Sequence, residues 1–240
     1  ASGTFSTIDT TAAGVSANNK YFGAAAVGGN VYFAPYFADA IGVLAVASSV
    51  FSTIDVTAAG ATGSYKYNGA AAVGDKVYFG PSKLNNIGVL DAATSTFSTI
   101  GTSSAGVTSA SGKYHGAAAV GTIVYFAPYN EDNVGSVDTA TSTFSTIGTA
   151  AAGVTANYKY SGAAAVGGKV YFAPYSQDNV GVLDIATSAF STIGTASAGV
   201  SGSHKYMGAA AVGTNVYFAP SGMGNVGMLD TTTSTFTTID

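Results

Sequence analysis

Short apolar runs separated by small and polar residues recur along the whole chain. One copy shows the pattern: residues 162–166 read Gly-Ala-Ala-Ala-Val, 170–173 read Val-Tyr-Phe-Ala, 180–184 read Val-Gly-Val-Leu-Asp, and 190–193 read Phe-Ser-Thr-Ile. Glycine pairs, a proline and Ser/Thr clusters separate these runs, which is typical of β-strands joined by tight turns. No segment of about eleven residues or more has helical spacing of its apolar positions. Each copy therefore predicts four antiparallel strands, which we name A to D in chain order.

Two motifs define the length of the repeat. Tyr-x-Gly-Ala-Ala-Ala-Val-Gly starts at five tyrosines, and Phe-(Ser/Thr)-Thr-Ile starts at six phenylalanines, in steps of 46 or 47 residues. Four strands repeated at this interval are typical of a β-propeller blade. We predict an all-β, five-bladed β-propeller with four antiparallel strands per blade, forming a single domain over residues 1–240. The predicted blades cover about residues 20–54, 66–100, 113–147, 159–193 and 205–239.

The composition of individual strands predicts how the blades are arranged. Strand B is apolar at successive positions, as expected of a strand that is covered on both faces by neighbouring blades. Strand A consists almost entirely of alanine and glycine, which suits the narrow centre where blades converge. We therefore expect strand A to be innermost, strand D to be outermost, and the five sheets to form a closed ring.

A surplus strand precedes the first blade. Residues 4–8, Thr-Phe-Ser-Thr-Ile, repeat the D strand, so the chain supplies six D strands for five A–B–C sets. Four interpretations are open: this strand closes the ring in place of residues 236–239, covers a sheet edge, pairs with another molecule, or belongs to a longer array. An unpaired strand edge is a template for association, so self-association through this strand is one expectation.

The unit resembles the kelch repeat. The resemblance rests on Ala-Ala-Val-Gly-x-x-Val-Tyr-Phe followed by Val-Leu-Asp-x-Ala-Thr-Ser-Thr-Phe, and it extends over essentially the whole chain. Two features depart from the family pattern: Ala-Pro or Gly-Pro stands in place of the double glycine, and phenylalanine in place of the tryptophan of strand D. The resemblance implies a propeller, which serves enzymes and binding scaffolds alike.

Composition narrows the classes of partner. Only 8% of residues are charged, against about 25% in ordinary soluble domains, the net charge is −4, and all eight basic residues are lysine. A nucleic-acid partner is not expected, because such proteins carry a basic surface rich in arginine. No apolar run of about 18 residues is present, so membrane insertion is not expected either. The absence of cysteine and arginine, with so few charges, favours an extracellular or exported protein.

The sequence contains no recognisable catalytic constellation. His115 and His204 have no orienting acid nearby in the repeat and are expected to be exposed polar variants. The recurring aspartates at the end of strand C are expected to act as turn residues. Asp39, Asp132 and Asp178 end the B–C loops, where a ring of oxygens could hold a cation, but turn chemistry is the favoured interpretation. We predict no enzyme activity, no cofactor and no metal.

The lysine before each motif tyrosine is the most distinctive candidate. Fivefold repetition would place these lysines around one mouth of the central channel, which would suit an anionic ligand. The favoured alternative is a structural lysine whose stem packs over the tyrosine and whose head pairs with a loop aspartate or carbonyl. The candidate ligand-binding residues are this lysine, the tyrosine and the variable residue that follows: Lys20, Tyr21, Phe22, Lys66, Tyr67, Asn68, Lys113, Tyr114, His115, Lys159, Tyr160, Ser161, Lys205, Tyr206 and Met207.

Differences between the copies gather on one face. The B–C and D–A loops, which emerge together in an up-and-down blade, vary more than the A–B and C–D turns. A variable loop face on a rigid scaffold favours a binding or interaction module, with glycans or proteins as the expected partners. The first alternative is a structural repeat subunit of a surface layer, filament or larger complex. A hydrolase with a site in the central channel is the third hypothesis.

Overall fold

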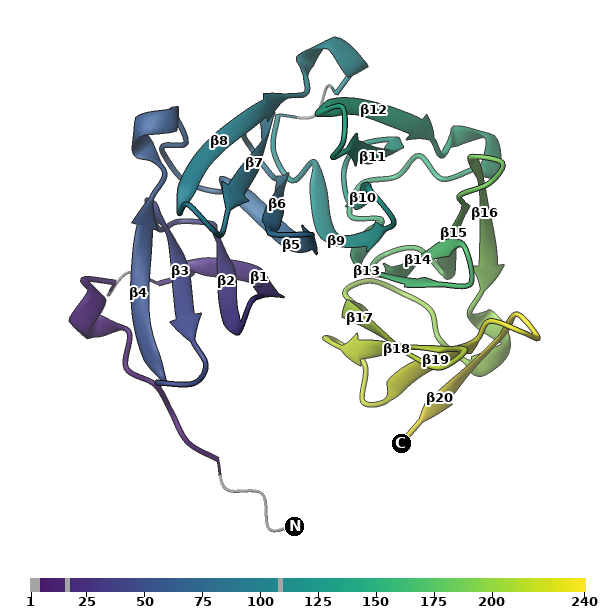
Figure 1. Cartoon of the computed structure of the whole chain (residues 1–240). Coiled ribbons are helices and arrows are strands. Elements are labelled where there is room, and N and C mark those ends of the chain that lie inside the picture. Colours follow the sequence, from purple (N-terminus) through teal and green to yellow (C-terminus); the bar gives the residue numbers. More distant parts are fainter. Residues whose placement is uncertain (1–4, 16–17, 108–109) are drawn as a thin grey trace.

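The computed structural model describes residues 5–15, 18–107 and 110–240. Five sheets of four antiparallel strands are arranged around a common centre (Figure 1). Within each sheet the strands follow chain order, from the innermost to the outermost. This confirms the predicted all-β fold with five four-stranded blades.

The strands of each blade have nearly the same bounds relative to the repeat. Blade 1 contains β1 (Tyr21–Val27), β2 (Asn30–Pro35), β3 (Ala40–Ala45) and β4 (Val50–Asp55). Blade 2 contains β5 (Tyr67–Val73), β6 (Lys76–Pro81), β7 (Asn86–Asp91) and β8 (Thr96–Gly101). Blade 3 contains β9 (Tyr114–Val120), β10 (Ile123–Pro128), β11 (Asn133–Asp138) and β12 (Thr143–Gly148). Blade 4 contains β13 (Tyr160–Val166), β14 (Lys169–Pro174), β15 (Asn179–Asp184) and β16 (Ala189–Gly194). Blade 5 contains β17 (Tyr206–Val212), β18 (Asn215–Pro220), β19 (Val226–Asp230) and β20 (Thr235–Ile239).

A short 3-10 helix precedes each blade and is the only helical structure among the described residues. The five are η1 (Thr11–Ala13), η2 (Thr57–Ala59), η3 (Ser103–Ala105), η4 (Ala150–Ala152) and η5 (Ala196–Ala198). No helix in the described ranges has the length and apolar character needed to cross a membrane.

Turn chemistry in the repeat fixes the register of the hairpins. The C–D turns place a serine in the left-handed region, for example Ser95 and Ser142, both with φ of 55°. Asp91, at the end of β7, accepts hydrogen bonds from the backbone N–H groups of Ala93 and Thr94, both at 3.1 Å. The expectation that these aspartates are turn residues is therefore confirmed at this position.

Inner strands approach one another very closely at a glycine. In each inner strand the ladder is irregular just after the motif tyrosine, as between Tyr67 and Ala70 in β5. A Cβ atom on Gly69 would lie 2.5 Å from the Cα of Gly116 in the next blade, and the φ of Gly69 is +85°. Both the conformation and the contact require glycine, so this position sets how tightly neighbouring blades converge.

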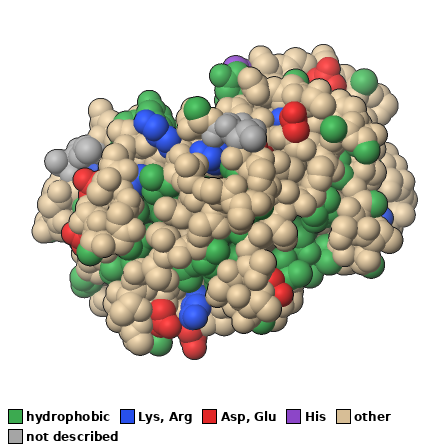
Figure 2. Space-filling model, turned by 90° about the horizontal axis from the view of Figure 1, so that it is seen from above, with side chains coloured by type: hydrophobic (Ala, Val, Ile, Leu, Met, Phe, Trp, Pro, Cys, Tyr) green, Lys and Arg blue, Asp and Glu red, His purple; other side chains and the backbone are tan. Residues whose placement is uncertain are grey.

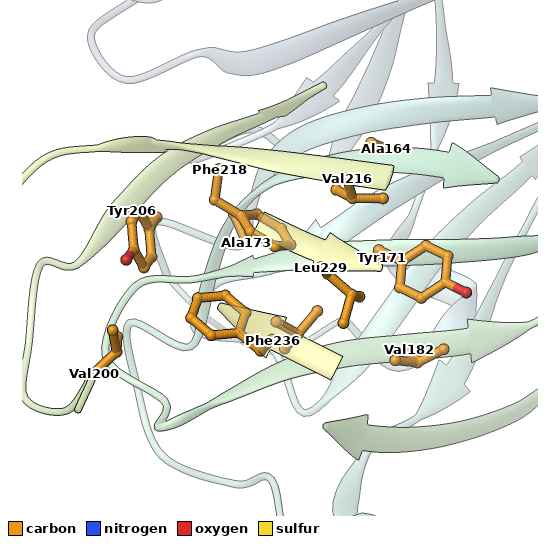
Figure 3. Packing of buried hydrophobic residues seen from close by; sticks show 11 residues of the cluster. Ala164, Tyr171, Ala173, Val182, Val200, Tyr206, Val216, Phe218, Leu229 and Phe236 are labelled. Carbon is orange, nitrogen blue, oxygen red and sulfur yellow. The ribbon is translucent and has the colours of Figure 1, made fainter. Parts of the chain in front are cut away.

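The hydrophobic core is divided into clusters that lie between neighbouring blades. Figure 3 shows the cluster between blades 4 and 5, where Tyr171, Ala173 and Val182 of blade 4 face Phe218 and Leu229 of blade 5. Three further clusters occupy the equivalent places between blades 1 and 2, 2 and 3, and 3 and 4. Both faces of the three middle blades are therefore buried, as the continuous apolar runs of strand B predict.

The ring does not close, and in this respect the structure differs from the predicted closed ring. Inner strands pack in the order β1, β5, β9, β13 and β17, and the two ends of this row lie apart (Figure 1). The outer place in blade 5 is taken by β20, which pairs with β19. Of the surplus strand, Thr4 lies outside the described residues, and residues 5–8 belong to no sheet. The five blades therefore span only part of a circle (Figure 1).

Candidate functional site

The motif lysines are structural in blades 2, 4 and 5. Lys66, Lys159 and Lys205 are fully buried, and each Nζ lies 2.9–3.0 Å from a B–C loop carboxylate of the preceding blade. The three carboxylates are those of Asp39, Asp132 and Asp178. Each ammonium group also donates to a carbonyl of its own D–A loop, that of Gly63, Ala156 or Gly202. Each of these lysines therefore links the B–C loop of the preceding blade to its own D–A loop, and its charge is not available to a ligand.

The other two lysines depart from this arrangement. Lys113 is also buried, but its Nζ donates to the carbonyl of Lys83 at 2.8 Å, and Asn85 stands where blades 1, 3 and 4 have aspartate. Burial lowers the pKa of Lys113, and the charge of Glu131 partly offsets this effect. Lys20, in blade 1, is only partly buried. The aspartates considered for a cation ring are therefore used as lysine partners, and no cluster of three or more metal-ligating side chains occurs in the described ranges.

The motif tyrosines are also structural. Tyr67, Tyr114, Tyr160 and Tyr206 are fully buried. Each hydroxyl donates to the Oδ1 of an asparagine at the start of strand C, at 2.5–2.9 Å. The four asparagines are Asn86, Asn133, Asn179 and Asn225. Tyr21 has Ala40 at the equivalent position, and its buried hydroxyl has no partner among the described residues.

The variable residue after each tyrosine lies near the centre of the loop face. Phe22 of blade 1 and His115 of blade 3 approach each other to a ring-centroid distance of 6.0 Å, although they are two blades apart. Asn68 and Ser161 are buried, whereas Met207 of blade 5 is exposed. The structure therefore brings this part of the candidate set together around the centre.

His115 is buried, contrary to the expectation that both histidines are exposed. Its ring stacks on Tyr129 at a centroid distance of 3.6 Å and an interplanar angle of 11°. Burial lowers the pKa of His115 to about 3, so the imidazole is neutral at physiological pH. His204 is exposed, as predicted. The difference arises because His115 lies within the inner strand β9 and stacks on Tyr129, whereas His204 lies in the D–A loop before β17.

A cavity of about 220 Å³ opens beside this stacked pair on the loop face. Its nine lining residues come from the B–C and D–A loops of neighbouring blades and from the start of β9, and all are uncharged at neutral pH because His115 is neutral. They are Tyr36, Tyr65, Ser82, Ser111, Gly112, His115, Tyr129, Asn130 and Tyr158. Tyr65 and Tyr158 keep 44% and 52% of their surface exposed, so their rings are available to a ligand.

Local structure holds the loops around the cavity in place. Tyr65 and Tyr158 adopt left-handed backbone conformations with φ of 61° and 59°, which non-glycine residues adopt only where the surroundings impose it. Asn130 bridges two loops: its Nδ2 donates to the carbonyl of Ser111 at 3.0 Å, and its Oδ1 accepts from the backbone N–H of Tyr158 at 3.1 Å. The site is therefore built before any ligand arrives.

A larger hollow of about 400 Å³ lies beside η1 at the edge of blade 1. Its lining contains one aromatic ring, that of Phe37, and its polar side chains are Thr53 and two aspartates, of which Asp39 already serves as the partner of Lys66. The smaller cavity offers more aromatic and hydrogen-bonding groups, so we take it as the candidate site. Figure 2 views the molecule at 90° to Figure 1, and on the side that it shows the charged side chains are few and scattered.

Sequence reasoning identified only one of the cavity residues as a site residue, His115. The variable D–A loop positions included Tyr65 and Tyr158, so loop variability did point to this face. Tyr36 and Tyr129 follow the proline that ends strand B, where the copies differ as well. This variation among the copies, at the residue after the proline, is the sequence signal that could have identified Tyr36 and Tyr129 as site residues.

Comparisons with known proteins bear on the fold. No protein-family model and no curated protein sequence matches the chain. Among solved structures, a streptogramin B lyase is similar over 92% of this chain and 68% of its own, with a TM-score of 0.70 and 18% identity. A virginiamycin B lyase from Staphylococcus aureus is similar over 88% of this chain and 66% of its own (TM-score 0.64, 14% identity). A chain of a nidogen/laminin complex is similar over 92% of this chain and 78% of its own (TM-score 0.66, 15% identity).

These likenesses show that the chain has a β-propeller fold. They also correct one prediction. The absence of catalytic motifs led us to expect no enzyme activity, but two of the similar structures are lyases. The architecture therefore accommodates enzymes as well as components of protein complexes, so the prediction that excluded an enzymatic role was wrong.

Proposed function

We propose that the chain is a binding module whose ligand contacts the loop face at the tyrosine-lined cavity. The observation that carries the proposal is the convergence of four tyrosines, one neutral histidine and one asparagine from several loops on a single preformed cavity. Aromatic rings provide contact area at small entropic cost, and hydroxyl and amide groups provide directional hydrogen bonds. In this proposal the blades are kelch-like, as the sequence motifs suggest, and the protein is exported.

The lining favours a neutral, hydroxyl-rich ligand such as a glycan. None of the residues around the cavity carries a charge that could select an anion or a cation, since burial keeps His115 neutral. Exposed tyrosine rings can stack on the apolar face of a sugar while Asn130 and the serines accept and donate hydrogen bonds. A protein segment is the second candidate, because a chain of similar fold occurs in the nidogen/laminin complex.

The experiment is a screen of the chain on an array of neutral glycans, followed by titration calorimetry with the best glycan. Tyr65→Ala and Tyr158→Ala are the test variants. Val46→Ala and Val50→Ala are the matched controls, because these valines are also exposed but lie at the C–D turn on the opposite face. Each tyrosine variant should weaken binding about tenfold, which corresponds to about 1.4 kcal/mol, and the controls should bind like the parent chain.

Two results would count against the proposal in different ways. An array on which no neutral glycan binds removes glycans as the ligand class and leaves the protein segment, to be tested by retention of partners on the immobilised chain. Binding that survives both tyrosine substitutions removes the cavity as the site.

A further inference from the structure

The two ends of the open ring expose the two halves of the inter-blade interface. Between blades 1 and 2, the face formed by Tyr32, Ala34, Ile41 and Val43 packs against the face formed by Tyr67, Val77, Phe79 and Leu90. We call these the leading face and the trailing face of a blade. Equivalent faces meet between each of the following pairs of blades. At each of the four contacts between neighbouring blades, the leading face of one blade therefore packs against the trailing face of the next.

The leading face of blade 5 has no blade against it. Val212 is 66% exposed, and Ala210 and Ala219 are exposed, whereas the equivalent Ala164 and Ala173 of blade 4 are buried. An apolar hollow of about 370 Å³ lies over β17 and β18. A Cβ atom on Gly208 would meet only the Cβ of Ala219, at 3.6 Å. A Cβ atom on any of the other four inner glycines would lie within 2.8 Å of the inner glycine of the next blade.

The trailing face of blade 1 is uncovered in the same way. Val31, Phe33 and Leu44 are partly exposed, whereas their equivalents in blade 2 are fully buried. The two end faces carry complementary halves of an interface that the chain uses repeatedly. Exposed apolar faces of this kind mark sites of interaction with another packed surface.

The segment before blade 1 supplies one strand of the missing element. Phe5 is 93% exposed, whereas the equivalent phenylalanines of the five D strands are buried or partly buried. Asp9 accepts a hydrogen bond from the backbone N–H of Thr11 at 2.8 Å, just as Asp55 accepts one from Thr57 at 2.6 Å. Residues 5–8 are therefore joined to blade 1 by the same turn that joins β4 to blade 2.

We propose that the gap between blades 5 and 1 is a binding site for a further A–B–C unit of this repeat, which takes residues 5–8 as its fourth strand. The unit would present a trailing face to blade 5 and a leading face to blade 1. It would also give residues 5–8, which belong to no sheet, a strand to pair with. The occupant is a repeat unit and not a second copy of the whole chain, because residues 5–8, joined to blade 1 by the inter-blade turn, already stand in the outer-strand position that a complete copy would fill with its own strand D.

The test extends the chain after Asp240 with a copy of residues 149–188, which comprise the linker and strands A, B and C of blade 4. A second extended chain carries a complete copy of residues 149–194 before that segment, in case the gap holds two units. Hydrogen exchange of residues 5–8 and the midpoint of thermal unfolding are measured for both chains and for the parent. In at least one extended chain we expect exchange in residues 5–8 to slow by more than about tenfold and the midpoint to rise.

Thr7→Pro is the matched control, because proline removes a ladder hydrogen bond from a paired strand but costs little in an unpaired one. It should leave the parent chain unchanged and should abolish the protection in the extended chain. The proposal is overturned if neither extended chain protects residues 5–8. It is also overturned if the parent chain already protects them by dimerising, since the occupant is then a second copy.

Discussion

Tyr21 is the motif tyrosine whose hydroxyl is buried without a partner among the described residues. Burial raises its pKa to about 12, which reflects the loss of solvent around the hydroxyl. The other motif tyrosines find an asparagine where blade 1 has Ala40. One residue therefore distinguishes blade 1 from the other blades at this position.

Ala40→Asn should stabilise the protein by about 1 kcal/mol, because it supplies the missing acceptor for a buried donor. Asn86→Ala is the reciprocal change, and it should destabilise by about 1–2 kcal/mol by leaving the Tyr67 hydroxyl unpaired. Urea unfolding of both variants measures the two effects. Equal unfolding midpoints for Ala40→Asn and the parent chain would show that the Tyr21 hydroxyl is already satisfied, for instance by water.

His115 makes stability depend on pH. Its pKa is about 3 in the folded protein and about 6.5 when unfolded, so between these values the unfolded chain binds a proton that the folded chain does not. Stability should therefore be highest above pH 6.5 and should fall as the pH drops, by about 2 kcal/mol at pH 5 from this residue. His115→Asn, which copies Asn68 of blade 2, should remove that part of the slope. Parallel pH profiles for the two proteins between pH 7.5 and 5 would refute this assignment.

At the scale of single elements, the inner strand is the most demanding part of the blade. Gly116 has a φ of +89°, and a Cβ atom there would lie 2.5 Å from the Cα of Gly162. Gly208 occupies the same position in blade 5, but a Cβ atom there would meet only the Cβ of Ala219, at an ordinary contact distance of 3.6 Å. Gly116→Ala should cost about 3 kcal/mol from clash and backbone strain together, whereas Gly208→Ala should cost about 1 kcal/mol from strain alone. Thermal unfolding of the two variants compares them directly, and equal losses would mean that blade 5 is covered.

The elements were largely predictable from the sequence, because each blade is defined by local patterns. Apolar runs such as Val170–Ala173, Gly-Gly turns and the proline after strand B predict the four strands and their order. The alanine-rich strand A also predicts its inner position. The favoured interpretation of the motif lysines as structural residues agrees with their burial in blades 2, 4 and 5. The particular partner was not predictable, because the Asp39 carboxylate that binds Lys66 lies 27 residues away in the chain.

The cavity was only partly predictable for a similar reason. Variation among the loops pointed to the correct face, but the stacking of His115 on Tyr129 depends on how the B–C loop of blade 3 folds back. Loop conformations of this kind are set by contacts between blades, for example the two hydrogen bonds of Asn130. The strands can be predicted because their pattern recurs in every copy. The cavity is harder to predict because its lining includes loop residues that differ from copy to copy.

At the scale of the whole molecule, the number of blades is fixed by the repeat but the closure of the ring is not. Closure depends on the angle between neighbouring blades, which arises from packing at the inner glycines and in the clusters between sheets. Five blades joined in this way leave blade 1 and blade 5 apart (Figure 1). The end blades are therefore expected to be the least protected parts of the protein.

The eight lysines provide the most direct test of the open, five-bladed arrangement. Brief acylation of the native protein, followed by mass spectrometry, reports the accessibility of each ammonium group. Lys66, Lys113, Lys159 and Lys205 are buried, so they should react slowly, whereas Lys76 and Lys83 are exposed and should react fast. Lys20 should also react, because no blade covers it. A Lys20 as protected as its four counterparts would indicate a closed ring, and five equally reactive motif lysines would contradict the buried ion pairs.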